Sequence, residues 1–378
     1  GTVLVNGRLD QLPFDNGEGR LEVRLPVTNA ELRFNPGWSP LTQINAQVDF
    51  TGRSMDILGS TAMMRTAELE NIRVQIRDLA RPVLTIKGDA SGDLPVMLAE
   101  LGSSTLAASY GGFVDSVTTS GPASLALDIS LPLTQTSQPV QVSGKIRLKG
   151  NTLKVNNTEF ELQQIKGQLV FDSNGIKGEQ LQARLFDRAT VARVWTSEGV
   201  TRISLDGRLG VLDRYLPKDN AIGAAISGDS DWRVLVIIRG MPGQGRQANV
   251  GVVVTSDLVG TQVGLPTPIG KDKASARTLS ITINDAVKPV KTLRITYGGV
   301  LDALLDISAD KQAAGILKAA VTSGGAEPVL PDEAMILLSG SLKQLHVTEW
   351  RPHLAGGDGP GLPVRLVLQV EELEVQNY

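Results

Sequence analysis

The stretch from Ser256 to Lys273, SDLVGTQVGLPTPIGKDK, carries the residue types of a phosphate-binding loop. Such a loop places four residues between its two glycines and a Ser or Thr after its lysine. Here five residues separate Gly264 from Gly270, and Asp272 follows the lysine. Two prolines inside the stretch also lack the amide hydrogens that would bind phosphate. The spacing therefore argues against a nucleotide site.

The other residues with chemical potential are two histidines and a short acidic pair. His346 and His353 flank Glu349 at a spacing that matches no common zinc pattern. Asp229-Ser-Asp231 is too short for a calcium loop, which needs further ligands and a distal glutamate. The chain has no Gly-x-Ser-x-Gly elbow to anchor a hydrolase triad. We therefore expect no enzyme, no metal and no cofactor.

Composition restricts the partners and the compartment. The 378 residues include 37 basic and 40 acidic side chains, a net charge of −3, which gives no electrostatic footprint for nucleic acid. There is no cysteine, hence no disulfide, a composition compatible with an oxidising compartment such as the periplasm. No run approaches the roughly 18 apolar residues of a membrane span. Because the chain starts at Gly1 and not at Met, we interpret it as a piece of a longer protein.

Elements with one apolar and one polar face dominate the chain. Apolar residues alternate with charged ones in many segments, a period of two that predicts β-strands. Turn signals and short connections between the segments favour antiparallel neighbours. The residues that this alternation assigns to the apolar face are Ile72, Val74, Ile76, Leu84, Ile86, Leu125, Leu127, Ile129, Ile146, Leu148, Ile203, Leu205, Val234, Val236 and Ile238. The same pattern continues at Leu279–Ile283, Leu293–Ile295 and Val364–Val370.

Helix signals are few. Asp93–Gly102 has an N-capping aspartate, an early proline and a terminal glycine. Val211–Asp219 and Ala309–Val321 are the other two candidates. These segments predict short helices within an all-β protein.

The chain also repeats itself at long period. Leu41–Phe50, LTQINAQVDF, is similar to Leu162–Phe171, LQQIKGQLVF, and each copy is followed by further strands and then by a helix signal. Stacked units of roughly 100–120 residues would share one core and form one elongated body. The predicted units are 1–28 (the end of a preceding repeat), 29–150, 151–270 and 271–378 (truncated).

The apolar face of such a sheet must be covered. A second sheet would make a sandwich, and closure would make a barrel. The third solution is an open trough whose lining contacts an apolar ligand. The lining consists of aliphatic side chains, which suit acyl chains and equally suit an ordinary protein core. The residues alone leave this choice open.

Three segments resemble a known family. Asn29–Gly52 with its Pro-Gly-Trp-x-Pro-Leu turn, Asn151–Phe171, and Ser256–Lys271 are similar to the AsmA-like family, and in particular to its very long YhdP-type members in Gram-negative bacteria. The resemblance extends from about residue 19 to about residue 350 and rests on structural motifs. The second repeat departs from the pattern, because Asn157–Glu161 replaces the Pro-Gly-Trp turn.

The resemblance implies a twisted β-sheet curled into an apolar groove that carries phospholipids between the inner and outer membranes. On that reading the fifteen residues above line the groove and contact acyl chains. The protein would lie in the periplasm, and an anchor in the inner membrane would lie outside this chain. The proline-rich stretch would cross the rim of the groove, where Lys271 and Lys273 could meet lipid phosphates. The alternative is a structural scaffold with a closed core; the oligomeric state stays open.

Overall fold

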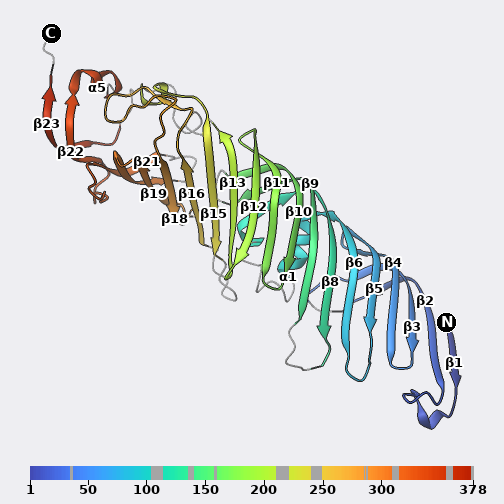
Figure 1. Cartoon of the computed structure of the whole chain (residues 1–378). Helices are drawn as coiled ribbons and strands as arrows, with labels where there is room; N and C mark the ends of the chain where they lie inside the picture. Colours follow the sequence, from blue (N-terminus) through green and yellow to red (C-terminus); the bar gives the residue numbers. More distant parts are fainter. Residues whose placement is uncertain are drawn as a thin grey trace.

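The computed structural model describes residues 1–34, 37–103, 114–134, 140–156, 160–209, 221–239, 249–284, 286, 288–308, 315–354 and 361–375. These residues form one long, twisted sheet of 21 strands, with the two chain termini at its opposite ends (Figure 1). A separate pair of two-residue strands lies outside the main sheet. The sheet is open, and the prediction of an elongated, twisted all-β fold is confirmed.

The strands of the main sheet are long for a globular protein. In the first half they are β1 (Thr2–Asn6), β2 (Arg20–Leu32), β3 (Leu41–Thr51), β4 (Ser54–Met64), β5 (Ala67–Ile76), β6 (Val83–Asp93), β7 (Val117–Ser120), β8 (Pro122–Pro132), β9 (Gln141–Val155) and β10 (Glu161–Asp172). In the second half they are β11 (Gly175–Leu185), β12 (Arg188–Ser197), β13 (Val200–Leu209), β15 (Ser230–Arg239), β16 (Asn249–Ser256), β18 (Leu279–Asn284), β19 (Val290–Tyr297), β20 (Leu301–Ser308), β21 (Gly315–Ser323), β22 (Ile336–His346) and β23 (Val364–Glu374). The small pair is β14 (Ile226–Ser227) with β17 (Gln262–Val263).

The strands follow one another across the sheet in chain order, with β7 placed beside β8 on the same partner, β9. Neighbours are antiparallel from β1 to β21, as the short connections predict. The last two pairs, β21 with β22 and β22 with β23, are parallel, so the antiparallel prediction is wrong at this end. The connections there are longer, and the second, which includes helix α5 (Val347–Leu354), returns the chain to the level at which β22 begins.

The two copies of the sequence repeat share a local irregularity. Gln43 in β3 and Gln164 in β10 both have a positive φ, of 51° and 52°, and both lie where the strand pairing shifts register. A β-bulge of this kind bends the strand and increases its twist. The stretches that are similar in sequence are thus similar in backbone, while the exact repeat boundaries remain a prediction.

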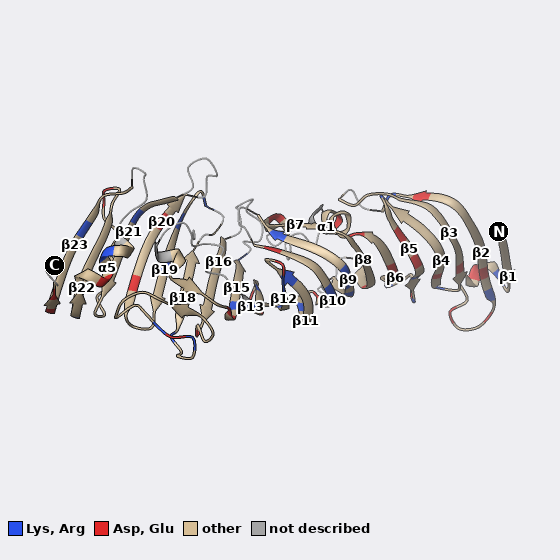
Figure 2. Ribbon diagram, turned by 90° about the horizontal axis from the view of Figure 1, so that it is seen from above, with Lys and Arg blue, Asp and Glu red and all other residues tan. Residues whose placement is uncertain are grey.

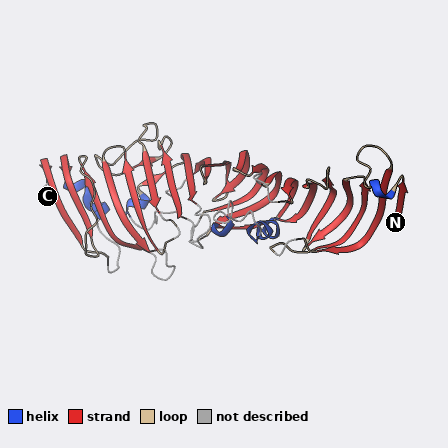
Figure 3. Ribbon diagram, turned by 90° about the horizontal axis from the view of Figure 1, so that it is seen from below, coloured by secondary structure: helices blue, strands red, loops and turns tan. Residues whose placement is uncertain are grey.

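The helices are short (Figure 3). Helix α1 (Leu94–Ser103) confirms the segment predicted over Asp93–Gly102. The candidate Val211–Asp219 lies outside the described residues. The third prediction, over Ala309–Val321, is wrong from Gly315 onwards, because that part is strand β21. Pairing with β20 on one side and β22 on the other overrides the helical propensity of its alanines. The remaining elements are α4 (Ala221–Ala224) and a 3₁₀ turn at Leu9–Gln11.

Candidate functional site: the apolar face of the sheet

Strand register shows which side chains share a face, since directly opposite residues in neighbouring strands point the same way. In the first half of the sheet Val74 lies opposite Ile86, which lies opposite Ile129. Leu125 lies opposite Ile146, one strand further along. The residues predicted from β5 to β9 therefore project from a single face.

The same face continues into the second half. Ile146 lies opposite Leu169, and from β12 onwards the row runs through Val194, Ile203, Val236 and Val252. Leu205 and Val234 form the parallel row beside it. The structure thus places all fifteen predicted residues on one face, which we call the apolar face.

The apolar face extends beyond the predicted set. The residues that continue its central row are Ile283, Leu293, Leu305, Ala319, Ile336 and Val364, each opposite the next. Apolar and polar residues alternate in the sequence of most of these strands, so their place on the apolar face could have been predicted. At β21 it was masked by the helical appearance of the alanine-rich segment.

Burial divides the fifteen residues into two groups. Ile76, Leu148, Ile203, Leu205, Val234, Val236 and Ile238 are buried, and five of these seven lie in β13 and β15. Ile72, Val74, Leu84, Ile86, Leu125, Leu127, Ile129 and Ile146 are half-buried. The apolar face is therefore partly accessible over β5–β9, except at Ile76 and Leu148, and covered over β13–β16.

Helix α1 covers part of the apolar face. Its Leu94, Met97 and Leu98 belong to the same apolar cluster as the inner residues of β8 to β18. The buried carboxylate of Glu100 ties the helix to the start of β3 by accepting hydrogen bonds from Ser39 N (3.1 Å) and Ser39 Oγ (2.8 Å). It also forms an ion pair with Arg65 at the end of β4 (2.5 Å). The helix is thus fixed to the sheet by both apolar and polar contacts.

The proline-rich stretch lies at one rim of the sheet, between the end of β16 and the start of β18, as predicted for a rim loop. Leu258, Ile269 and Val263 from this connection are buried or packed against the apolar residues below. We call residues 257–278 the rim segment.

Lys271 in the rim segment does not face solvent. Its side chain is 7% exposed, and Nζ donates to three main-chain carbonyl oxygens, those of Leu258 (2.9 Å), Thr261 (2.6 Å) and Asp272 (2.8 Å). Burial, and then the nearby Arg277, hold the pKa of the ammonium below its usual value. The suggestion that Lys271 meets lipid phosphates is therefore wrong, because its donors are already used. Lys273, in contrast, is exposed.

A second anchor lies at the end of the rim segment. Arg277 Nη1 donates to the carbonyls of Pro268 (2.9 Å) and Ile269 (2.8 Å), and the guanidinium lies 5.0 Å from the centroid of the Tyr297 ring. Tyr297 Oη also donates to Ile269 O (2.9 Å). Burial raises the pKa of this phenol, and Arg277 partly opposes the shift. The anchor fixes the rim segment to β19.

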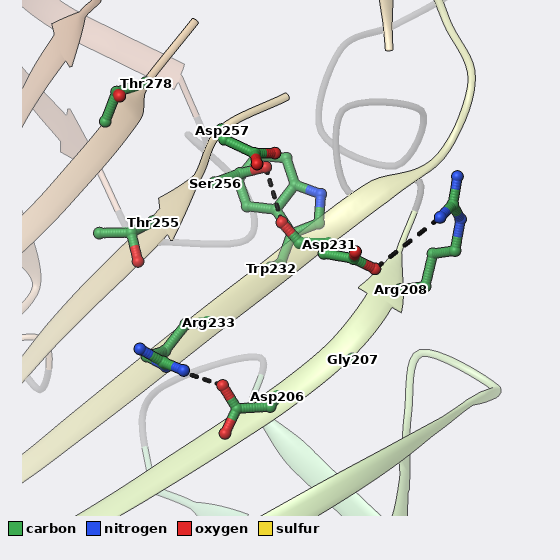
Figure 4. Close-up of a pocket in the computed structure, with 10 residues that line it drawn as sticks. All are labelled: Asp206, Gly207, Arg208, Asp231, Trp232, Arg233, Thr255, Ser256, Asp257 and Thr278. Atoms are coloured by element: carbon green, nitrogen blue, oxygen red, sulfur yellow. Dashed lines mark hydrogen bonds and ion pairs between the residues drawn. The ribbon is translucent and has the colours of Figure 1, made fainter. Parts of the chain in front are cut away.

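Charged residues are distributed along the length of the sheet (Figure 2). In β13 and β15 the register places Asp206 and Arg233 on the face opposite the apolar face. Asp206 accepts from Arg193 (2.8 Å) and Arg233 (2.7 Å) on the two neighbouring strands. Asp206 and Arg233 border a concavity of about 500 Å³, where Arg208 also faces Asp231 (Figure 4). Within this concavity Asp206 is thus paired with Arg233, and Asp231 with Arg208.

The described residues contain no metal-binding constellation of three or more His, Cys, Asp or Glu side chains. His346 instead pairs with Glu374, with 2.7 Å between Nδ1 and Oε2. Among the described helices none has the length and apolarity needed to cross a membrane.

Fold and site together define an elongated, open β-sheet protein with one continuous apolar face. A sequence model described as the YhdP protein matches residues 1–377, and the chain belongs to this family. A relative is the intermembrane phospholipid transporter YhdP of Escherichia coli strain K12, 23% identical over 292 residues. That alignment covers 75% of this chain and 22% of the relative, so the chain spans under a quarter of its length. No solved structure matches the chain.

Proposed function

We propose that this chain is a segment of a phospholipid conduit, in which acyl chains lie along the apolar face while headgroups remain near water. The observation that carries the proposal is the continuity of the apolar face, which passes from strand to strand by direct opposition of aliphatic residues. The name of the relative, an intermembrane phospholipid transporter, supports the same class of ligand.

The energetic reason for such a face is the cost of moving a lipid through water. Transfer of a methylene group into water costs about 0.8 kcal/mol, so an acyl chain of about 16 carbons costs roughly 12 kcal/mol. A continuous aliphatic surface removes most of that transfer cost along the whole path of the lipid. No catalytic step is required for this, and we propose that the segment is non-enzymatic.

The proposed setting is the periplasm, between the inner and outer membranes. Contacts with either membrane would be made by regions outside this chain. The half-buried residues of β5–β9, such as Ile86 and Leu127, would contact acyl chains directly.

A scaffold with a closed core is the second candidate. It is favoured by one observation: Val236 and Val252, in the middle of the apolar face, are 2% and 0% exposed. A side chain without solvent access is an ordinary core residue until its cover moves. The two candidates differ in whether lipid binds the accessible part over β5–β9.

Native mass spectrometry of the purified chain tests the proposal. We expect co-purified phospholipid, and we expect less of it in the double variant Ile86→Asn with Leu125→Asn, which makes the accessible apolar face polar. The matched control is Thr85→Asn with Ser124→Asn, on the opposite face of the same strands. A chain without lipid, or equal lipid in both variants, would favour the scaffold.

A further inference from the structure

The rim segment covers one end of the apolar face at β15, β16 and β18. Leu258, 1% exposed, and Ile269 pack into the cluster that contains Trp232, Val254 and Leu279 on the sheet. Apolar side chains of the rim segment therefore contact apolar side chains of the sheet. A lipid acyl chain in the same place would make the same kind of contact.

Hydrogen bonds hold the first residues of the rim segment against the ends of β15 and β16. Thr261 Oγ1 donates to Ser230 Oγ at the start of β15 (3.0 Å). Leu258 N donates to Ser256 Oγ at the end of β16 (3.0 Å). These hydroxyl contacts are buried, and each is replaceable by water if the segment lifts away.

Lys271 stabilises the rim segment from within, because all three of its carbonyl partners belong to this segment. Two of its three carbonyl partners, on Leu258 and Thr261, belong to the part that packs on the sheet. Burying an ammonium group is costly, and main-chain dipoles compensate for the lost water. The ammonium thus stabilises one conformation of the segment while it carries a desolvation cost that opening would remove.

Trp232 provides an independent observation beneath the segment. Its side chain is 3% exposed on the apolar face, and its buried indole Nε1 has no acceptor among the described residues. A buried donor without a partner is rare in native proteins and destabilises the arrangement that contains it. Displacement of the rim segment would let this N–H reach water or a lipid oxygen.

We infer that the rim segment is a gate over the apolar face, closed in this structure and opened to admit lipid to the section at β13–β18. The inference rests on the proposed function, because a gate has meaning only if lipid uses the face. In the closed state Leu258 and Ile269 occupy the place of an acyl chain. In the open state the lipid replaces those contacts and supplies an oxygen to Trp232.

A disulfide across the gate tests this inference. The chain has no cysteine, so Ser230→Cys with Thr261→Cys introduces one unambiguous pair at positions whose hydroxyl oxygens are 3.0 Å apart. The matched control is Leu235→Cys with Val253→Cys, which lie directly opposite each other on the other face of β15 and β16 and tie the two strands without touching the segment. A short methanethiosulfonate cross-linker gives the same ties where oxidation is incomplete.

The readout is uptake of NBD-labelled phosphatidylethanolamine from vesicles of phosphatidylethanolamine and phosphatidylglycerol. We expect the oxidised gate variant to take up lipid into the covered section about tenfold more slowly than its reduced form. A photo-crosslinker at Val254 reports arrival in that section, and the control pair should be unaffected by oxidation. Equal arrival in oxidised and reduced gate variants would overturn the gate. Absence of lipid uptake in every form, wild type included, would instead overturn the proposed function.

A second variant opens the gate instead of locking it. Lys271→Met keeps the apolar stem and removes the three hydrogen bonds. We expect amide exchange in residues 257–278 to accelerate severalfold while exchange in β5–β9 is unchanged, and lipid to arrive faster at Val254. Faster exchange without faster arrival would show that Lys271 only stabilises a loop, and the gate inference would fail.

Discussion

The apolar face over β5–β9 and the apolar face over β13–β16 have the same construction and different access. In both, aliphatic residues of one face oppose one another across antiparallel strands. Leu127 in the first region is half-buried, whereas Val236 in the second is 2% exposed. The apolar face is therefore alike in the two regions, and they differ in exposure because other parts of the chain cover the second region.

The cover comes from the connections between strands. Two residues, Gly52 and Arg53, join β3 to β4, and such a turn cannot reach over the sheet. Residues 257–278 join β16 to β18, and this connection is long enough to fold back on the apolar face. Of these two connections, only the long one contributes to the cover of the apolar face.

The largest expected effect belongs to a charge placed in the covered region. Val236→Arg puts an unpaired guanidinium between Ile203 and Val252, where no water reaches it. We expect a loss of roughly 3 to 5 kcal/mol in the free energy of unfolding, measured by urea denaturation, or no folded protein at all. Leu235→Arg, on the opposite face of the same strand, is the control. A folded Val236→Arg with near-native stability would show that this region is open.

The same change in the accessible region should be tolerated by the fold. Leu127→Arg allows the guanidinium to reach water along its flexible stem, so we expect a loss of only about 1 to 2 kcal/mol in stability. Lipid passage should nevertheless fail, because a conduit works in series and one hydrated obstacle interrupts it. Outer-membrane integrity in cells expressing the full-length protein is the measurement. Ala126→Arg, which points to the polar face, should leave it intact.

A smaller effect is expected on the polar face. Asp206→Asn weakens the ion pairs with Arg193 and Arg233, whose side chains are largely exposed. Exposed pairs contribute up to about 1 kcal/mol each and are screened by salt. We expect a small decrease in melting temperature that shrinks at high salt, with lipid binding unchanged. A loss of lipid binding would mean that the polar face takes part in transport.

The smallest expected effect is a pH dependence in the covered region. The pKa of Lys271 is lowered in the folded state, so between that lowered pKa and the ordinary value the unfolded chain binds more protons than the folded one. The contribution of Lys271 to stability should therefore rise with pH, between its folded pKa and its ordinary value near 10.5. Urea denaturation across this range should show a slope in the wild type that Lys271→Met lacks. Identical slopes would refute the assignment to Lys271.

The sequence predicted which side chains share a face, because alternation is a local property of each strand, while lipid contact along that face stays a prediction. All fifteen residues, from Ile72 to Ile238, lie on the face that alternation assigned to them. The burial of the apolar face was not predictable in the same way, since it depends on where the long connections between strands fold. Lys271 illustrates the point: its type and its proline-rich surroundings suggested an exposed cation, and only the fold brings the carbonyls of Leu258 and Thr261 around it.

The errors at the end of the sheet have a similar cause. Gly315–Val321 has helix-forming residues, and its strand conformation depends on two neighbours that are distant in sequence. The parallel pairing of β22 with β23 depends on α5, which sequence patterns did not indicate. Long-range pairing therefore decided what local propensity could not.

Site-specific photo-crosslinking in living cells tests the central claim most directly. A benzophenone side chain at Leu127 projects from the accessible apolar face, and one at Arg147 projects from the polar face one strand away. We predict that the probe at Leu127 captures phospholipid and that the probe at Arg147 does not. Equal labelling at the two positions, or no lipid at Leu127, would contradict a lipid pathway along the apolar face.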